Sequence, residues 1–159
     1  MKSKNPRVDS SFIIHHSSFI IRPCYDARLF LLERCVATVE LNKGNFEDAV
    51  IHNEMVIIDF WASWCGPCKS FAPVFEAASE QHPDIVFGKV NADDEQELAA
   101  AFSIRSIPFV MLMREKVVLF AQAGALPAEG LESVIRQARA LDMAQVHKEV
   151  AEQQAQQQQ

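Results

Sequence analysis

The sequence predicts an α/β domain in which a central mixed β-sheet is flanked by helices on both faces. Two observations lead to this prediction. Short segments rich in β-branched and aromatic residues alternate with segments of helical periodicity. The last two strand-like segments are separated only by the charged turn 114–116, which is short enough for an antiparallel hairpin. The predicted element order is therefore βαβαβαββα.

The chain has 159 residues, of which 49% are hydrophobic, so it is long enough to bury one core and too short to argue for two. Sequence patterns typical of strands and helices begin near residue 37. The predicted strands are 37–41, 54–62, 84–92, 107–113 and 116–122. The predicted helices are 45–52, a helix through 71–78, 94–104 and a final helix from about residue 127.

Local signals indicate where the helices start and which faces they bury. Asn45 or Asn42 is expected to cap the first helix, and Asp93 or Asp94 the third. Pro73 is placed to kink the second helix. The final helix is amphipathic, and its apolar face carries Leu131, Val134, Ile135, Ala138 and Leu141. We expect this face to pack on the sheet.

The chain divides into three regions. Residues 1–35 contain a seven-residue repeat, SSFIIHH and then SSFIIRP, that fits neither a heptad seam nor strand alternation. We expect a poorly ordered N-terminal extension there, with a hairpin or docking arm as the alternative. Residues 36–142 form the predicted domain. Residues 143–159 are expected to be a helical or frayed Gln-rich tail.

Charge and hydropathy exclude two classes of partner. The chain has 15 basic and 21 acidic residues and no basic run, so we expect no nucleic-acid partner. No apolar run approaches the ~20 residues that span a membrane. Lys2, Lys4 and Arg7 are typical of a signal peptide, but no continuous apolar stretch or cleavage site follows them. We therefore expect a cytoplasmic protein.

The pair Cys65 and Cys68 is the strongest candidate for chemistry. At spacing i and i+3 in a first helical turn, the two thiols are close enough to form a disulfide and to act as a redox switch. Cys65 falls at the helix start, where free N–H groups stabilise a thiolate, and this favours it as the nucleophile. Cys68 should face inward and attack the mixed disulfide. Pro67 suits the first turn, and Gly66 leaves the nucleophile accessible.

Two other interpretations of the cysteines stay open at this stage. A CxxC pair is half of a zinc site, and Cys24 with Cys35 supplies two further thiols, although their spacing is wide for a metal knuckle. Alternatively, Cys65 and Cys68 are two inert thiols of the core. We expect no metal, because the pair lies at a strand-to-helix turn.

The segment DFWASWCGPCK, with SIRSIPF about forty residues later and GAL before the last helix, closely resembles the thioredoxin family over about residues 37–142. The resemblance implies the thioredoxin fold and the reduction of protein disulfides by a dithiol. It also implies recycling by a thioredoxin reductase, which passes electrons from NADPH through FAD. The chain itself needs no bound cofactor, and we expect it to be a monomer.

The resemblance assigns Cys65 as the attacking cysteine and Cys68 as the resolving cysteine. It identifies Asp59 and Lys89 with the family's buried acid and the neighbouring lysine. From the residues alone, Asp59 interrupts strand 54–62, which is apolar on both faces, so desolvation should raise its pKa and suit it to accept a proton from Cys68. The alternatives are that Asp59 only bonds a backbone group and that Lys89 is an exposed strand lysine.

The same resemblance predicts the substrate-contact surface. Pro108 resembles the family's cis-proline, although a trans proline at a strand edge is the alternative. The backbone of Ile107 would then pair with an extended substrate, and Gly124 resembles a glycine that leaves room for a partner. The other expected contacts are Trp61, Trp64, Gly66 and Pro67.

The chain departs from the family pattern at two places. Phe109 stands where many members have threonine, and the turn 114–116 replaces a glycine-containing hairpin. These departures concern substrate preference. Two other function classes also remain: an exported thiol oxidant or isomerase on the same fold, and a binding module or holdase whose thiols are incidental.

Overall fold

The computed structural model describes residues 38–157. The expectations for the extension 1–35, including Cys24 and Cys35, lie outside the described residues. The strands are β1 (Thr38–Glu40), β2 (Met55–Trp61), β3 (Val86–Asn91), β4 (Phe109–Arg114) and β5 (Val117–Ala123). The helices are α1 (Phe46–His52), α2 (Gly66–Gln81), α3 (Gln96–Ala101), α4 (Ala128–Ala140) and α5 (Met143–Gln157).

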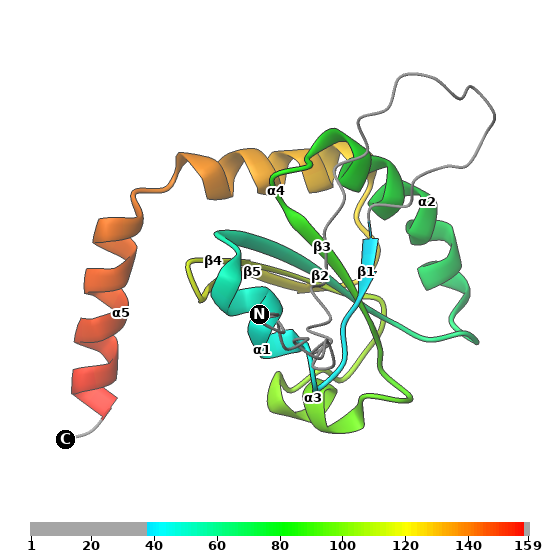
Figure 1. The fold of residues 1–159 in the computed structure, drawn as a ribbon, viewed down its shortest axis with the longest axis horizontal. Helices are drawn as coiled ribbons and strands as arrows, with labels where there is room; N and C mark the ends of the chain where they lie inside the picture. The colour runs from blue at the N-terminus through cyan, green and yellow to red at the C-terminus, as the bar shows by residue number, and fades with distance from the viewer. Residues whose placement is uncertain (1–37, 158–159) are drawn as a thin grey trace, which may run out of the picture. The chain divides into compact units, whose positions relative to one another are not determined.

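The five strands form one mixed sheet in the order β1-β3-β2-β4-β5. Strands β1, β3 and β2 pair in parallel, and β4 pairs antiparallel with both β2 and β5. Figure 1 shows α2 and α4 on one side of this sheet and α1 and α3 on the other. The predicted fold class, a mixed sheet with helices on both faces, is therefore confirmed.

Two apolar clusters hold the layers together, one on each face of the sheet. Phe71 and Phe75 of α2 pack with Leu131 of α4 against the face that carries Ile57 of β2. On the other face, side chains of α1 and α3 pack with Val56, Ile58 and Phe60. Alternate residues of β2 thus point to opposite faces, as the strand period of two requires.

Strand β2 lies between β3 and β4 and is covered on both faces, so every residue from Met55 to Phe60 is buried. The prediction of a strand that is apolar on both faces is confirmed. Asp59 is the one charged residue of this strand, and it is only 1% exposed. A carboxyl group in this place has lost nearly all contact with water, and its chemistry depends on its neighbours.

The expected cap of the third helix is wrong. Helix α3 begins at Gln96 with Glu95 at the N-cap position, and no side chain caps it. The two aspartates have other partners: Asp93 accepts a hydrogen bond from the indole of Trp64, and Asp94 accepts one from Asn91. Because these carboxylates hold the loop between β3 and α3, they are not available to the helix.

The hairpin between β4 and β5 is confirmed, with Glu115 and Lys116 as its two turn residues. Their φ angles are 49° and 69°, so both adopt the left-handed conformation of a type I′ turn. Asparagine and glycine usually take these positions because the conformation costs other residues free energy. A charged pair is therefore an unusual solution at this turn.

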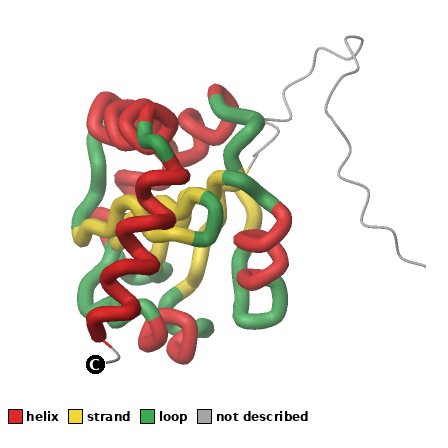
Figure 2. Tube along the Cα trace, turned by 90° about the vertical axis from the view of Figure 1, so that its left-hand side faces the viewer, coloured by secondary structure: helices red, strands yellow, loops and turns green. Residues whose placement is uncertain are grey.

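The buried face of helix α4 is shorter than the sequence predicts. Leu131, Ile135 and Ala138 are buried as expected, but Leu141 is the C-cap residue and is 44% exposed. The helix ends there, and the chain continues as the separate helix α5, shown in Figure 2. Met143 is buried at the start of α5, and His147 bonds Glu115 of the hairpin turn at 2.9 Å.

Arg114, the last residue of β4, connects the sheet to the end of α4. Its guanidinium donates to the carbonyl oxygens of Ala138 at 3.0 Å and Leu141 at 3.3 Å, and to Oε1 of Glu54 at 3.1 Å. These bonds satisfy carbonyls that have no partner within the helix and place a positive charge at the negative end of its dipole.

We expect Arg114→Ala to lower the free energy of unfolding by about 1 to 3 kcal/mol, because it leaves those carbonyls and Glu54 without a charged donor. The measurement is a urea denaturation midpoint at neutral pH. Arg136→Ala, an exposed arginine on α4, is the matched control and should change the midpoint little. Equal losses in both variants would show that the Arg114 bonds contribute nothing beyond surface charge.

Candidate active site

The site is built around a disulfide between Cys65 and Cys68, whose Cα atoms are 5.3 Å apart. Cys65 is the N-cap residue of α2, and its Sγ accepts a hydrogen bond from the backbone N–H of Cys68 at 3.2 Å. Both cysteines are buried, with 4% and 2% of their surface exposed. Their position on the helix, rather than their exposure, distinguishes them chemically.

A short turn brings the cysteines to the carboxyl end of β2. The strand ends at Trp61, and the N–H of Cys65 bonds the carbonyl of Ala62 at 3.2 Å, which closes the turn before α2 begins. Pro67 lies in the first turn of α2, where no helical partner for its missing N–H is required. A Cβ on Gly66 would contact nothing within 4 Å among the described residues, so this side of the disulfide is open.

Asp59 lies on the face of the sheet that α2 covers, because it follows Ile57 by two residues and Ile57 packs against α2. Neither of its carboxylate oxygens has a hydrogen-bond partner among residues 38–157. Burial raises the pKa of Asp59 to about 7, and the positive charge of Lys89 opposes the shift. The group therefore keeps its proton to a much higher pH than an exposed aspartate does.

Lys89 stands beside Asp59 in the register of β2 and β3. It is half-buried, and its Nζ lies 5.0 Å from the ring centroid of Trp61, within range of a cation–π interaction. The indole N–H of Trp61 is buried with no partner in the part of the chain that is described. Asp59, Lys89 and Trp61 thus form a polar group on the α2 side of the sheet.

The peptide bond between Ile107 and Pro108 is cis, the isomer expected from the sequence. Ile107 packs against the cluster of Ala62, Cys65 and Cys68, so a segment that follows the disulfide by about forty residues lies next to it. Within residues 38–157, no backbone hydrogen bond engages Ile107, whereas the carbonyl of Pro108 accepts from Gly124 at 2.8 Å. Gly124 has a φ of 100°, which a side chain would disfavour.

Trp64 is 68% exposed next to Cys65, and its indole N–H donates to Oδ2 of Asp93 at 2.8 Å. From the sequence, Asp93 is expected only as a helix cap, and this contact is not predicted. A topological signal was available, because β2 and β3 are parallel and their carboxyl ends meet at one edge of the sheet. Residues that follow β3 therefore lie beside the residues that follow β2.

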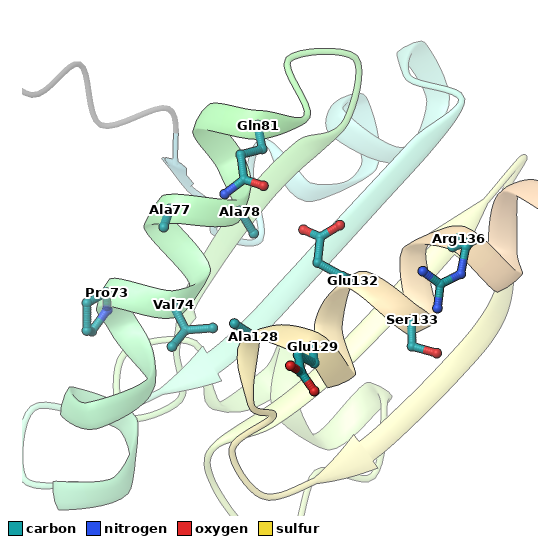
Figure 3. A pocket seen from close by; sticks show the side chains of 10 residues that line it. All are labelled: Pro73, Val74, Ala77, Ala78, Gln81, Ala128, Glu129, Glu132, Ser133 and Arg136. Carbon is teal, nitrogen blue, oxygen red and sulfur yellow. The ribbon is translucent and has the colours of Figure 1, made fainter.

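A larger hollow lies away from the disulfide, between α2 and α4 (Figure 3). Its volume is about 770 Å³, and its walls include Pro73, Val74, Ala77, Ala128, Glu132 and Arg136. Glu132 is bonded to His82 at 3.0 Å, which joins the two helices. The hollow contains no thiol, so the reacting groups lie elsewhere.

Residues 38–157 contain no cluster of three or more side chains arranged to bind a metal ion. The zinc alternative involved Cys24 and Cys35, which lie outside this range, and Cys65 and Cys68 are joined to each other. None of the described helices combines the length and the apolar character needed to cross a membrane.

The fold and the site define a class of protein: an α/β domain with a disulfide at a helix N-terminus, beside a cis-proline. The thioredoxin family model matches residues 37–137. The chain is 61% identical to putative thioredoxin 2 of Streptomyces coelicolor over 120 residues, covering 76% of this chain and 90% of the relative. It is 41% identical to a thioredoxin of Haemophilus influenzae, covering 62% and 94%.

Solved structures of thioredoxins also match this chain. A point-mutant thioredoxin from Halobacterium salinarum matches with a TM-score of 0.62 at 28% identity, covering 66% of this chain and 93% of that one. Plasmodium falciparum thioredoxin matches with a TM-score of 0.58 at 31% identity, covering 62% and 96%. The chain belongs to the thioredoxin family, and it is a thiol–disulfide oxidoreductase that reduces protein disulfides.

Proposed function

We propose that this protein works in the cytoplasm as a monomeric reductant of protein disulfides and that a thioredoxin reductase restores its dithiol with electrons from NADPH through FAD. The observation that carries the proposal is the placement of the Cys65–Cys68 disulfide at the N-terminus of α2, near the backbone of Ile107, which no backbone hydrogen bond engages within residues 38–157. An extended substrate can pair with that backbone while its disulfide meets the cysteines.

In the proposed reaction the Cys65 thiolate attacks one sulfur of the substrate disulfide, and the other sulfur leaves as a thiolate. The N–H of Cys68, which already donates to Sγ of Cys65, and the start of α2 favour the anionic sulfur. Cys68 then loses its proton and attacks Sγ of Cys65, which releases the second substrate thiol. Two electrons pass from the dithiol to the substrate.

Asp59 is proposed as the proton acceptor for Cys68, and Lys89 as the cation that keeps the pKa of Asp59 from rising further. A carboxyl group with a pKa of about 7 is well matched to take a proton at neutral pH, directly or through one water molecule. The proposed contacts with the substrate are Trp61, Trp64, Gly66, Pro67, Ile107, Pro108 and Gly124.

Insulin reduction with NADPH and thioredoxin reductase, combined with a measured redox potential, tests this proposal. Rapid turnover and a potential near about −270 mV would support a reductant. A potential nearer about −120 mV would instead indicate an oxidant or isomerase. No turnover at all would indicate a binding module or holdase with incidental thiols.

Residues 36–142 are proposed as the catalytic domain, because every residue of the candidate site lies between Asp59 and Gly124. Deleting residues 1–35 should therefore leave insulin turnover within about twofold and change the free energy of unfolding by less than about 1 kcal/mol. Turnover and a denaturation midpoint measure both quantities. A loss of several kcal/mol on deletion would contradict the proposed boundary.

A further inference from the structure

A hollow of about 520 Å³ is lined by Trp64, the residue before Cys65, and by the segment that ends at Ile107. Three alanines, Ala92, Ala99 and Ala100, line it together with Ile104. These short side chains leave room for an aliphatic side chain of a bound molecule. Trp64 directly precedes Cys65, and Ile107 packs against the cluster of Ala62, Cys65 and Cys68, so two residues that line the hollow also border the reactive site.

The charged residues at the rim of the hollow are not equivalent. Asp93 is engaged by the indole N–H of Trp64. Nearby, Glu97 forms an ion pair with Lys43. Arg105 is an exposed residue of the rim, and none of the ion pairs within residues 38–157 includes it. A carboxylate from outside is the partner that best fits this guanidinium.

We propose that this hollow is a subsite that selects protein substrates with an aliphatic side chain within two residues of the attacked cysteine and with an acidic residue two positions from that aliphatic residue, so that both side chains face the hollow. The aliphatic side chain fills the alanine-lined floor, and the carboxylate pairs with Arg105. The inference rests on the proposed function, in which the substrate lies extended along Ile107. An extended chain advances about 3.3 Å per residue, so residues next to the cysteine remain at the hollow.

The test uses peptides whose single cysteine is joined by a disulfide to 2-nitro-5-thiobenzoate. The reduced full-length protein attacks the peptide sulfur, and the coloured thiolate leaves because its pKa is low. Each peptide carries leucine or glycine at one position within two residues of the cysteine. Two positions from that residue it carries glutamate, glutamine or lysine. The second-order rate constant is measured for each peptide.

We expect the wild-type protein to react about three to ten times faster with the best leucine–glutamate peptide than with its lysine counterpart, and less so at high salt. Arg105→Glu should reverse this preference. Arg136→Glu is the control, because Arg136 is exposed on α4 and does not line the hollow next to Trp64. This variant should keep the preference for glutamate. Equal rates for the two peptides, or a preference that survives Arg105→Glu, would overturn the proposal.

The floor of the hollow is tested separately. Ala100 is exposed on α3, so Ala100→Leu fills the hollow without entering the core. It should abolish the advantage of leucine over glycine, whereas Ala101→Leu, the next residue of α3, should leave it intact. An advantage that survives Ala100→Leu also overturns the subsite. If the wild type reduces no disulfide, including a small one without a peptide, the proposed function itself fails.

Discussion

The Cys65→Ser variant is expected to lose insulin reduction by a factor on the order of 10³ or more, because the serine hydroxyl is not ionised at neutral pH and cannot replace the thiolate. The structure favours Cys65 as the nucleophile because it is the N-cap residue of α2 and its sulfur accepts the N–H of Cys68. An insulin turnover assay measures the loss.

Cys68→Ser should lose turnover equally but behave differently with substrates. Its Cys65 thiolate still attacks, and the mixed disulfide accumulates because the second thiolate is missing. Non-reducing electrophoresis and intact-mass measurement detect the trapped adduct. If Cys65→Ser traps substrates as well as Cys68→Ser does, the assignment of the two roles is wrong.

Asp59→Asn should slow the resolution of that mixed disulfide by about 10² to 10⁴ at neutral pH, the usual contribution of a positioned base. In the wild type, resolution should accelerate as Asp59 ionises around its pKa of about 7. The variant should lack this acceleration, and the difference should be smallest at high pH, where Cys68 ionises without help. Stopped-flow rates between pH 6 and 9 measure both effects.

The same group makes stability depend on pH. Burial raises the folded-state pKa of Asp59 to about 7, above its ordinary value of 3.8, so the unfolded chain releases the proton more readily than the folded protein. The contribution of Asp59 to stability is therefore full below pH 4 and is lost as pH rises through 7. The free energy of unfolding that is lost over this pH range is roughly 4 kcal/mol, at about 1.4 kcal/mol per pH unit.

Asp59→Asn removes this dependence, so it should stabilise the oxidised protein at pH 8. The net gain should be about 1 to 3 kcal/mol, because a buried amide without a partner has its own cost. Denaturation midpoints from pH 4 to 8 measure it, with Asp48→Asn, at an exposed residue of α1, as the control. A variant that is less stable at pH 7 and resolves at the wild-type rate would contradict both the raised pKa of Asp59 and its role as proton acceptor.

The sequence by itself determined the features that depend on local pattern. The apolar run of β2 predicts a strand buried on both faces, and the spacing of Cys65 and Cys68 at a helix start predicts a disulfide; the structure shows both. Helical periodicity likewise predicts the buried face of α4, apart from Leu141. These properties follow from residues a few positions apart, whose relation a strand or a helix specifies directly.

Only the tertiary structure decided the environment of each polar side chain. The sequence predicts that burial raises the pKa of Asp59, but the value of about 7 also depends on the charge of Lys89, thirty residues later, which stands beside Asp59 and opposes the shift. Asp93 bonds Trp64 across 29 residues of sequence, and that contact removes it from the cap of α3. Ile107 reaches the cysteines, and the hollow next to Trp64 forms, only when β4 pairs with β2. Desolvation and side-chain pairing depend on which distant segments pack together, and periodicity does not encode that information.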